Sequence, residues 1–413
     1  MAIFEDESRG ESSRLKPLTW YLIGTGSWFA SHGIQNVMFA WLVTIVLNES
    51  PVMVGVAQLA LLFPATLLML IGGSLADRLG GKRVAVVSQS LAIFPLGTLA
   101  IFLLFDQLSF GVMIAYAIAI GSLQAFVTPA RDGLLNSVAQ GNIQRTVVKV
   151  TLIQFLVQMG GFTLAGTADA IGGFLIIATQ TTIVAGGAIA LGQLPKQRDS
   201  DIRLATEPWF PALTRSIKNG FNTVWSNPSM RMVVVQNVAM GICFMGSYVV
   251  TIPLLIRERY DGSSDDLAFV NLVNSTGLVV TILAQLILRE IRHKGNALLL
   301  AHGIGTLILS LASLGFDFPY FLTLMFCWGA CGGVAMSMSR TIMQEEAPND
   351  QRGSVMSFFS FSFMGAGPIG ALLWGFIAEY IGPQIALFVA CTLMFAIVLC
   401  ITTYAKRRGI KFN

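Results

Sequence analysis

The sequence is poor in charged residues, and this scarcity restricts the kind of protein it can encode. Of its 413 residues, 12% are charged and 54% are hydrophobic, whereas about 25% are charged in an average soluble domain. A water-soluble protein with so little charge would expose large apolar patches and aggregate. We therefore expect lipid to surround most of this chain.

Residues suited to metal, redox or phosphate chemistry are also scarce. The chain has only three histidines, His32, His293 and His302. The five cysteines lie singly in apolar segments, apart from Cys327 and Cys331, which are one helical turn apart. This spacing indicates neither a metal site nor a disulfide framework. The chain has no glycine-rich loop ending in Gly-Lys-Ser/Thr, which argues against ATP-driven chemistry. We expect no cofactor, no metal and no enzymatic activity.

Long apolar stretches are abundant, and each is long enough to cross a bilayer, which takes about 20 residues. We predict twelve spans, and they must be helical because hydrocarbon leaves no backbone group without a partner. The fold class is therefore an all-α membrane protein with twelve transmembrane helices. The predicted spans cover approximately residues 18–46, 52–75, 83–105, 108–128, 147–168, 171–192, 230–255, 267–288, 297–315, 319–339, 354–376 and 384–404.

Lysine and arginine fall on one side when the loops are assigned to alternating faces of the membrane. With the N-terminus inside, all 26 of these residues except Arg257 and Arg259 lie in inner segments. Cytoplasmic loops of membrane proteins carry such an excess. The pattern predicts a multi-pass protein of the cell inner (plasma) membrane with both termini in the cytoplasm. We interpret the net charge of +4 as a topology signal and expect no nucleic acid partner. Arg257 and Arg259 stand among acidic residues, which indicates a locally paired outer-loop cluster.

The longest loop separates spans 6 and 7 and divides the chain into two halves. We predict an N-terminal tail over residues 1–17, a six-helix bundle over 18–192, a central linker over 193–229, a second bundle over 230–404 and a tail over 405–413. Residues 205–225 combine apolar side chains such as Trp209 and Phe221 with the basic residues Arg215 and Lys218. This segment is either a short helix on the inner membrane surface or a solvated linker.

The two halves resemble each other at the inner ends of spans 4 and 10. Arg131 follows span 4 and Arg340 follows span 10, at corresponding positions. Duplication of half the chain is typical of transporters built from repeats, in which the substrate site lies at the repeat interface. We therefore expect two pseudo-symmetric six-helix bundles around a central site.

The loop between spans 2 and 3 reads Gly73-Ser74-Leu75-Ala76-Asp77-Arg78-Leu79-Gly80-Gly81-Lys82-Arg83. In this position of a six-plus-six protein, the segment resembles the corresponding motif of the major facilitator superfamily, although Gly81 stands where that family usually has a basic residue. Pro129-Ala130-Arg131 and the stretch from Gln344 to Ser357 are similar to the enterobactin-exporter-type branch. That branch contains siderophore and drug exporters.

The resemblance implies a gate at the inner ends of the spans. In families with this motif the aspartate holds the halves together while the cavity opens outward, which assigns Asp77, Arg78 and Arg131 to the gate. Lys82 and Arg83 are alternatively simple topology charges. The full set of predicted motif and gate residues is Gly73, Asp77, Arg78, Gly80, Lys82, Arg83, Arg131, Arg340 and Arg352.

Span 11 contains a glycine-proline element at residues 365–370. Pro368 removes a backbone donor, which predicts a kink, and the glycines permit tight packing. The element is similar to one that exporters of the superfamily carry in span 5. Here span 5 has Gly160-Gly161-Phe162 in its place, so the element does not by itself indicate antiport.

Polar side chains form a stripe on span 1. His32, Gln35 and Asn36 are spaced i, i+3 and i+4 and share one helix face. Polar groups at membrane depth need partners or a water-filled cavity, and in the superfamily span 1 lines the central cavity. The alternative is that they bond to neighbouring helices. The predicted cavity residues are Trp28, His32, Gln35, Asn36, Gln124, Gln236, Asn237, Trp328 and Met336.

The resemblance implies alternating access and export of a small amphipathic organic compound, drug or siderophore-like, by proton antiport. The middles of spans 1, 4, 7 and 10 contain no acidic residue, so the proton-coupling candidates are His32, Asp77, Asp132 and Asp169. Two alternatives stay open, a transporter of lysophospholipid or other lipid and a non-transporting membrane sensor. We expect contacts with membrane lipid and a monomeric protein.

Overall fold

A computed structural model describes residues 17–138, 143–195, 209–287, 291, 293–348 and 351–407. Helices make up the regular structure within these ranges. Two of them, η1 and η3, are short π-helical turns inside longer helices. In order they are α1 (Pro17–Trp41), η1 (Leu42–Val46), α2 (Pro51–Leu79), α3 (Gly81–Leu104), α4 (Phe110–Val138), α5 (Ile143–Gly166), α6 (Ala168–Ile171), α7 (Gly173–Gly192), α8 (Trp209–Ser226), α9 (Pro228–Met240), η3 (Gly241–Gly246), α10 (Ser247–Tyr260), α11 (Ser264–Ile287), α12 (Lys294–Ala312), α13 (Phe318–Glu346), α14 (Arg352–Met364), α15 (Ala366–Ile381) and α16 (Pro383–Arg407).

The predicted spans coincide with these helices, and the fold class is confirmed. Eleven helices within the described ranges are long and apolar enough to cross a membrane. The predicted fifth span corresponds to α5, a helix of 24 residues. Its first turns contain Arg145 and Lys149, which lower its hydropathy. Three predicted spans combine several elements: the first is α1 and η1, the seventh is α9, η3 and α10, and the eleventh is α14 and α15.

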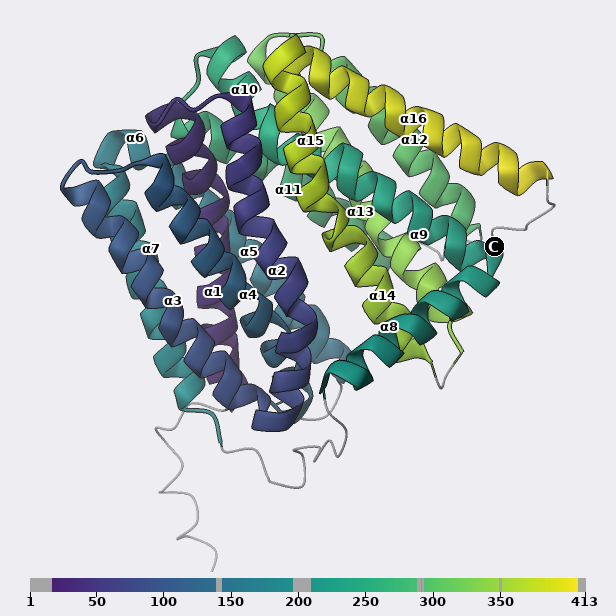
Figure 1. Cartoon of the computed structure of the whole chain (residues 1–413), viewed down its shortest axis with the longest axis horizontal. Helices are drawn as coiled ribbons and strands as arrows, with labels where there is room; N and C mark the ends of the chain where they lie inside the picture. Colours follow the sequence, from purple (N-terminus) through teal and green to yellow (C-terminus); the bar gives the residue numbers. More distant parts are fainter. Residues whose placement is uncertain are drawn as a thin grey trace, which may run out of the picture.

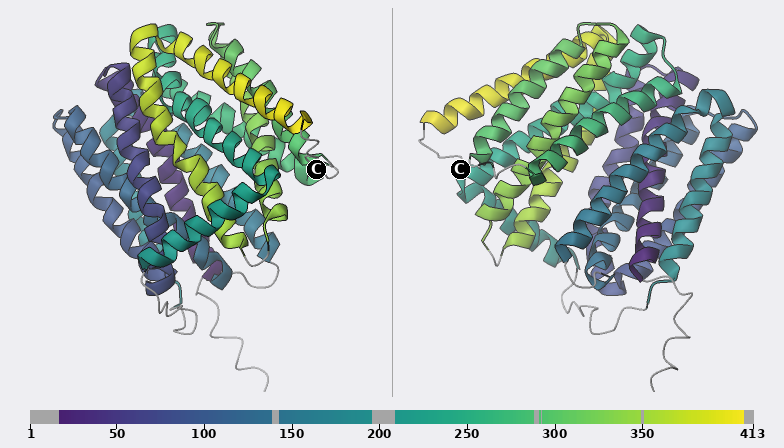
Figure 2. Two further views of the ribbon diagram at one scale, coloured as in Figure 1. Left: turned by 45° about the vertical axis from the view of Figure 1, so that its right-hand side comes forward. Right: turned by 180° about the vertical axis from the view of Figure 1, so that it is seen from behind.

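The helices form two groups that lie side by side (Figure 1). Helices α1–α7 make up the first, which we call the N-group, and α8–α16 make up the second, the C-group. Figure 2 shows the same division from two other directions. The segment 205–225, for which the sequence leaves both a surface helix and a solvated linker open, contains most of α8, which packs against α14 of the C-group. Its place on a membrane surface stays a prediction.

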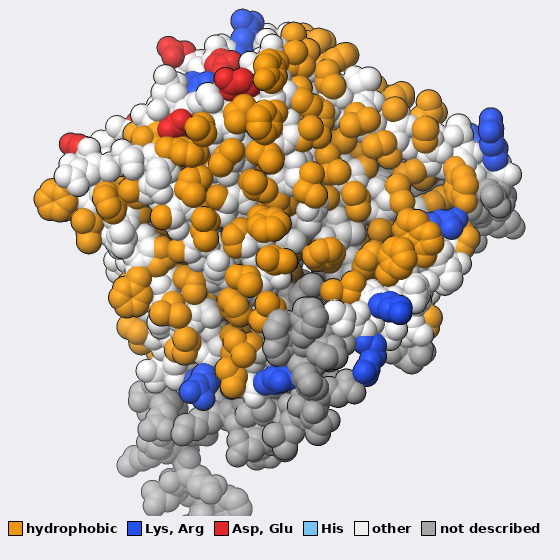
Figure 3. All heavy atoms as spheres, in the orientation of Figure 1, with side chains coloured by type: hydrophobic (Ala, Val, Ile, Leu, Met, Phe, Trp, Pro, Cys, Tyr) orange, Lys and Arg blue, Asp and Glu red, His pale blue; other side chains and the backbone are white. Residues whose placement is uncertain are grey.

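Charged side chains gather toward the two ends of the molecule, and apolar side chains cover the surface between them (Figure 3). Large apolar residues such as Phe94 and Ile287 are 69% and 86% exposed. Such a belt suits hydrocarbon as the surrounding solvent. We call the two ends of the helical bundle the Arg257 end, which is the predicted outer end, and the Arg83 end, which is the predicted inner end.

The eleventh span is interrupted at Gly365, between α14 and α15. Pro368 lies in the first turn of α15 and has no N–H to donate to the carbonyl of Met364, four residues earlier. The predicted kink is therefore present as a break in the helix. Pro253 in α10 has the same effect on the carbonyl of Val249. The carbonyls of Met364 and Val249 therefore lack their hydrogen bond within the helix and can accept one from another helix.

Candidate functional site

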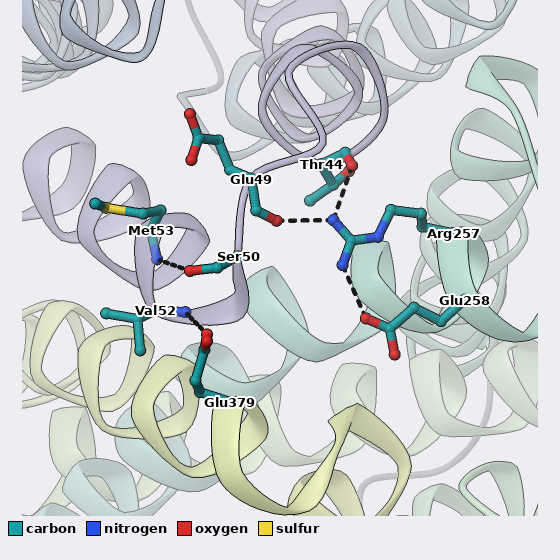
Figure 4. Close-up of polar contacts among 8 residues, drawn as sticks. All are labelled: Thr44, Glu49, Ser50, Val52, Met53, Arg257, Glu258 and Glu379. Atoms are coloured by element: carbon teal, nitrogen blue, oxygen red, sulfur yellow. Dashed lines mark hydrogen bonds and ion pairs between the residues drawn. The ribbon is translucent and has the colours of Figure 1, made fainter.

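Polar contacts join the two groups at the Arg257 end (Figure 4). Nη1 of Arg257 in α10 donates to the carbonyl oxygens of Thr44 and Glu49, at 3.1 Å and 2.7 Å. Its Nη2 lies 2.8 Å from Oε1 of Glu258. The predicted local pairing with an acidic neighbour is thus present for Arg257, but its two carbonyl contacts reach the other group. Arg259 donates to Gly315 within the C-group.

Helix N-termini contribute two further contacts at this end. Glu379 of α15 accepts a hydrogen bond from the Val52 N–H at the start of α2, at 3.1 Å (Figure 4). Asp169 of α6 accepts from the Ser264 N–H at the start of α11, at 2.5 Å, and from Nε1 of Trp41 at 3.2 Å. A carboxylate is favourable at a helix N-terminus because the first N–H groups lack partners within the helix. Both carboxylates therefore stabilise the contact between the groups.

The carbonyls freed by the two prolines also connect the groups, nearer the centre of the molecule. Oγ1 of Thr66 in α2 lies 3.1 Å from the carbonyl oxygen of Met364. Nε2 of Gln58, also in α2, donates to the carbonyl oxygen of Val249 at 3.3 Å. A buried carbonyl needs a donor, and a proline in the helix makes it available to the neighbouring group. The prolines in α10 and α15 thus position α2 across the boundary.

A cavity of about 270 Å³ lies between the groups and next to these contacts. From the N-group, α1 contributes His32, Asn36 and Phe39, which follow the i, i+4, i+7 spacing of one helix face. Gln58 and Gln124 extend the polar lining from α2 and α4. The cavity therefore combines imidazole and amide groups with an aromatic ring.

The C-group side of this cavity is more apolar. Tyr248 lines it and hydrogen-bonds Asn271 at 3.3 Å. The Tyr248 ring stacks on Trp328, with centroids 5.2 Å apart. Met245 and Ile252 complete the face that this part of the seventh span presents. One side of the cavity thus offers polar groups and the other an aromatic and aliphatic surface, a combination that suits amphipathic molecules.

A second cavity of about 160 Å³ adjoins the first, and His32, Ala65, Gln124 and Met364 line both. Arg131 of α4 lines the second cavity. Its side chain is buried, and its Cζ atom lies 4.7 Å from the centre of the Phe29 ring. Its backbone carbonyl accepts a hydrogen bond from the Tyr21 hydroxyl at 3.2 Å.

The predicted cavity residues divide into two sets. Trp28, His32, Asn36 and Gln124 line the cavities. The others lie outside both cavities. Gln35 is buried, and Met336 is 49% exposed. Gln236 contacts His302 at 2.5 Å, and Asn237 donates to Ser362 and Phe359. The Trp328 ring stacks on Tyr248.

Gln236 and Asn237 show why spacing alone could not assign these side chains. Both lie in α9 and find partners within the C-group, which is the alternative of bonding to neighbouring helices. Sequence reasoning missed Gln58, Thr66 and Tyr248 as lining residues. Gln58 could have been singled out, because an isolated amide in an apolar span needs a partner or a cavity.

Close helix contacts explain Gly81 of the motif between α2 and α3, and Gly72 just before the motif. A Cβ atom on Gly72 would lie 2.2 Å from the carbonyl oxygen of Ala125, so this glycine lets α2 meet the backbone of α4. A Cβ atom on Gly81 would lie 2.7 Å from the carbonyl oxygen of Ala130. This contact is a physical reason for the departure from the family pattern, because a basic side chain would clash there.

The charged members of the predicted gate lie in different surroundings. Lys82 donates to the carbonyl of Gly192 at 2.8 Å and to that of Leu194, so it ties α3 to the end of α7. The side chain of Asp77 lies outside the described part of the structure. Of the remaining members, Gly73 would have a Cβ atom 3.9 Å from Pro129, and Gly80 has a φ of 86°. Arg131 is buried and Arg78 is half-buried. The exposed members are Arg83, Arg340 and Arg352.

The coupling candidates are also separated. His32 lines the cavities, Asp169 joins the groups at the Arg257 end, and Asp132 is exposed next to Arg131. Within the described residues, no cluster of three or more His, Cys, Asp or Glu could hold a metal ion. The arrangement places one titratable ring, His32, at the centre of the site.

Two groups of membrane-length helices around a shared cavity, joined by polar contacts beside it and at the Arg257 end, form a multi-pass membrane protein. The sequence pattern of the Major Facilitator Superfamily matches residues 21–371, and the chain belongs to this superfamily.

Its relatives and structural neighbours are transporters. The chain is 26% identical over 409 residues to the multidrug efflux pump Tap of Mycolicibacterium fortuitum, covering 95% of this chain and 96% of that protein. It is 24% identical over 379 residues to the uncharacterized transporter YfiS of Bacillus subtilis, covering 87% and 86%. A mutant form of the nucleoside transporter NupG shares the fold with a TM-score of 0.79 and 12% identity, covering 94% and 99%. The human organic anion transporter MFSD10 shares it with a TM-score of 0.67 and 12% identity, covering 93% and 98%.

Proposed function

We propose that this transporter exports a small amphipathic organic compound, drug or siderophore-like, by alternating access and in exchange for protons. The observation that carries the proposal is the cavity between the two groups, with polar groups on α1 and an aromatic and aliphatic face on α10. The similarity to a multidrug efflux pump supports export. The motif segments that resemble the enterobactin-exporter-type branch support the same class of substrate.

In this mechanism the N-group and the C-group rock against each other around the cavity. The contacts of Arg257, Glu379 and Asp169 close the Arg257 end. They must break for the cavity to open there. The predicted gate, which includes Asp77 and Arg78, would hold the Arg83 end closed in that second state.

Proton exchange requires a group that gains and loses a proton as the cavity changes sides. We propose His32 for this role, because it lines both cavities and an imidazole can take up and release a proton. Asp77, Asp132 and Asp169 are the other candidates. We further propose that the protein is a monomer of the cell inner membrane, with both termini in the cytoplasm and membrane lipid around its apolar belt.

Efflux from proteoliposomes tests this function. Purified protein is reconstituted with fluorescent amphipathic dyes of positive, neutral and negative charge, and release is followed with and without an imposed pH gradient. We expect at least one dye to be transported faster when the gradient favours proton exchange. Dye flux that ignores the gradient would contradict antiport, and no flux above protein-free vesicles would contradict export.

A lipid substrate is the main alternative and is tested in the same vesicles with a fluorescent lysophospholipid. A lipid site would be expected to have an apolar lining with His32 and Gln35 packed away from it, and Gln35 does lie outside both cavities. His32, Asn36 and Gln58 instead line the cavity, which favours an organic solute. Transfer of the lysophospholipid, together with no dye flux, would reverse this assignment.

A further inference from the structure

Arg131 is a buried cation with hydrogen-bonding capacity that the protein does not use. The residue is 1% exposed, and its Nε and Nη1 atoms are buried without a hydrogen-bond partner. A buried charge is unfavourable unless it is paired and hydrogen-bonded. An acceptor in the adjoining cavity would satisfy both donors.

The described side chains around Arg131 stabilise a cation, but they supply no acceptor for its Nε and Nη1 atoms. The face of the Phe29 ring attracts the guanidinium at 4.7 Å, but it offers no lone pair to the two N–H groups. The carboxylate of Asp132, the next residue, acts on Arg131 through its charge, but it accepts no hydrogen bond from Nε or Nη1. The ion pairs between described residues join Arg257 with Glu258 and Lys294 with Glu345.

The cavity at Arg131 is lined by several groups that can donate hydrogen bonds. Gln124, Thr128 and Arg131 follow one another at i, i+4 and i+7 on one face of α4, and His32 faces the same cavity from α1. Amide, hydroxyl, imidazole and guanidinium groups all carry N–H or O–H donors. A cation placed here would be repelled, and a neutral amide would use fewer of the donors than an oxyanion.

We propose that this cavity binds the oxyanion group, above all a carboxylate, of the transported compound, whose apolar part lies in the larger cavity. The two cavities share His32, Ala65, Gln124 and Met364, so one molecule can occupy both. Its apolar part would then lie against Phe39 and Tyr248. This inference rests on the proposed transport function and makes the substrate class an amphipathic organic anion.

Thermal unfolding of the purified full-length protein in detergent tests the proposal with three probes of one aromatic body. They are 2-naphthoate, 2-naphthamide and 2-naphthylmethylammonium. We expect naphthoate to raise the midpoint of unfolding more than the other two, and to bind the wild type about tenfold to a hundredfold more tightly than it binds Arg131→Gln. Equal effects of the acid and the amide on the wild type, including no effect of either, would overturn the proposal.

Three variants separate binding from folding. Lys149→Gln removes the same charge from an exposed position of α5 and should keep the preference for the acid. Arg131→Lys keeps the positive charge but has fewer hydrogen-bond donors, and it should retain part of the preference for the acid. It therefore tests the site even if Arg131→Gln does not fold. Asp77→Asn should also keep the preference for the acid, because in this proposal the ligand, and not Asp77, accepts the hydrogen bonds of Arg131. Loss of the acid preference in Lys149→Gln, or its retention in Arg131→Gln, would contradict the assignment.

The outcome is distinguishable from failure of the transport function. A protein that exports cationic or neutral dyes in proteoliposomes, yet shows no preference for naphthoate, would refute only the oxyanion site. A protein that prefers naphthoate through Arg131 but moves no dye along a pH gradient would refute only the proposed export.

Discussion

Replacing Arg257 with glutamine should shift the transporter toward the state that is open at the Arg257 end. The guanidinium makes two hydrogen bonds to carbonyls of the other group, at 3.1 Å and 2.7 Å, and the side chain is 19% exposed. A hydrogen bond to a charged group contributes about 1.5–3 kcal/mol when well buried, and partial exposure reduces this. We expect the two bonds together to favour the closed end by about 2 kcal/mol, or about 30-fold in population.

Spin-label distances measure this shift directly. Labels at Gln107→Cys and Asp317→Cys, in a cysteine-free background, report the separation of the two groups at the Arg257 end, because both residues are exposed and belong to different groups. Arg257→Gln should add a longer distance to the distribution. Arg259→Gln is the matched control, since Arg259 bonds to Gly315 within its own group. Equal distributions for the two variants would refute the role of Arg257 as a contact between groups.

Further predictions concern the packing, the cavity and the motif. Gly81→Arg should lower stability by about 1–3 kcal/mol through overpacking against Ala130, whereas Gly133→Arg, in open space, should not; thermal unfolding in detergent checks both. Ala65→Trp should fill the junction of the two cavities and abolish dye binding while the protein still folds, as measured by fluorescence titration and size-exclusion chromatography. Asp77→Asn should slow transport in proteoliposomes while leaving ligand affinity unchanged; transport at the wild-type rate would argue against its gating role. His32→Ala should weaken ligand binding or reduce its pH dependence, and no change in either would assign His32 to packing.

The membrane architecture could be predicted from sequence because each span must satisfy its own backbone and cover its own length of hydrocarbon. Those requirements are local, so composition and loop charge were sufficient for the fold. The break at Gly365 was also predictable, since Pro368 alone removes the donor for Met364. The bond that this carbonyl receives from Thr66 was not, because it depends on where α2 lies.

The candidate site could be predicted only in part for the same reason. The periodicity of α1 indicated that His32 and Asn36 share a face, and both line the cavity. Gln236 showed a comparable signal, yet it bonds to His302, a partner 66 residues away that no local pattern reveals. The contacts of Asp169 with Trp41 and Ser264 likewise depend on three segments meeting in space.

A disulfide between the groups tests the central claim, transport by alternating access, most directly. Asp169 and Ser264 belong to opposite groups, and the Asp169 N–H lies 3.1 Å from Oγ of Ser264, so Asp169→Cys with Ser264→Cys can be cross-linked in a cysteine-free background. We predict that the oxidised protein in proteoliposomes still binds dye but does not transport it, and that a reductant restores transport to the rate of the same variant before oxidation. If the fully cross-linked protein transported dye as fast as the same protein after treatment with a reductant, the account would be contradicted.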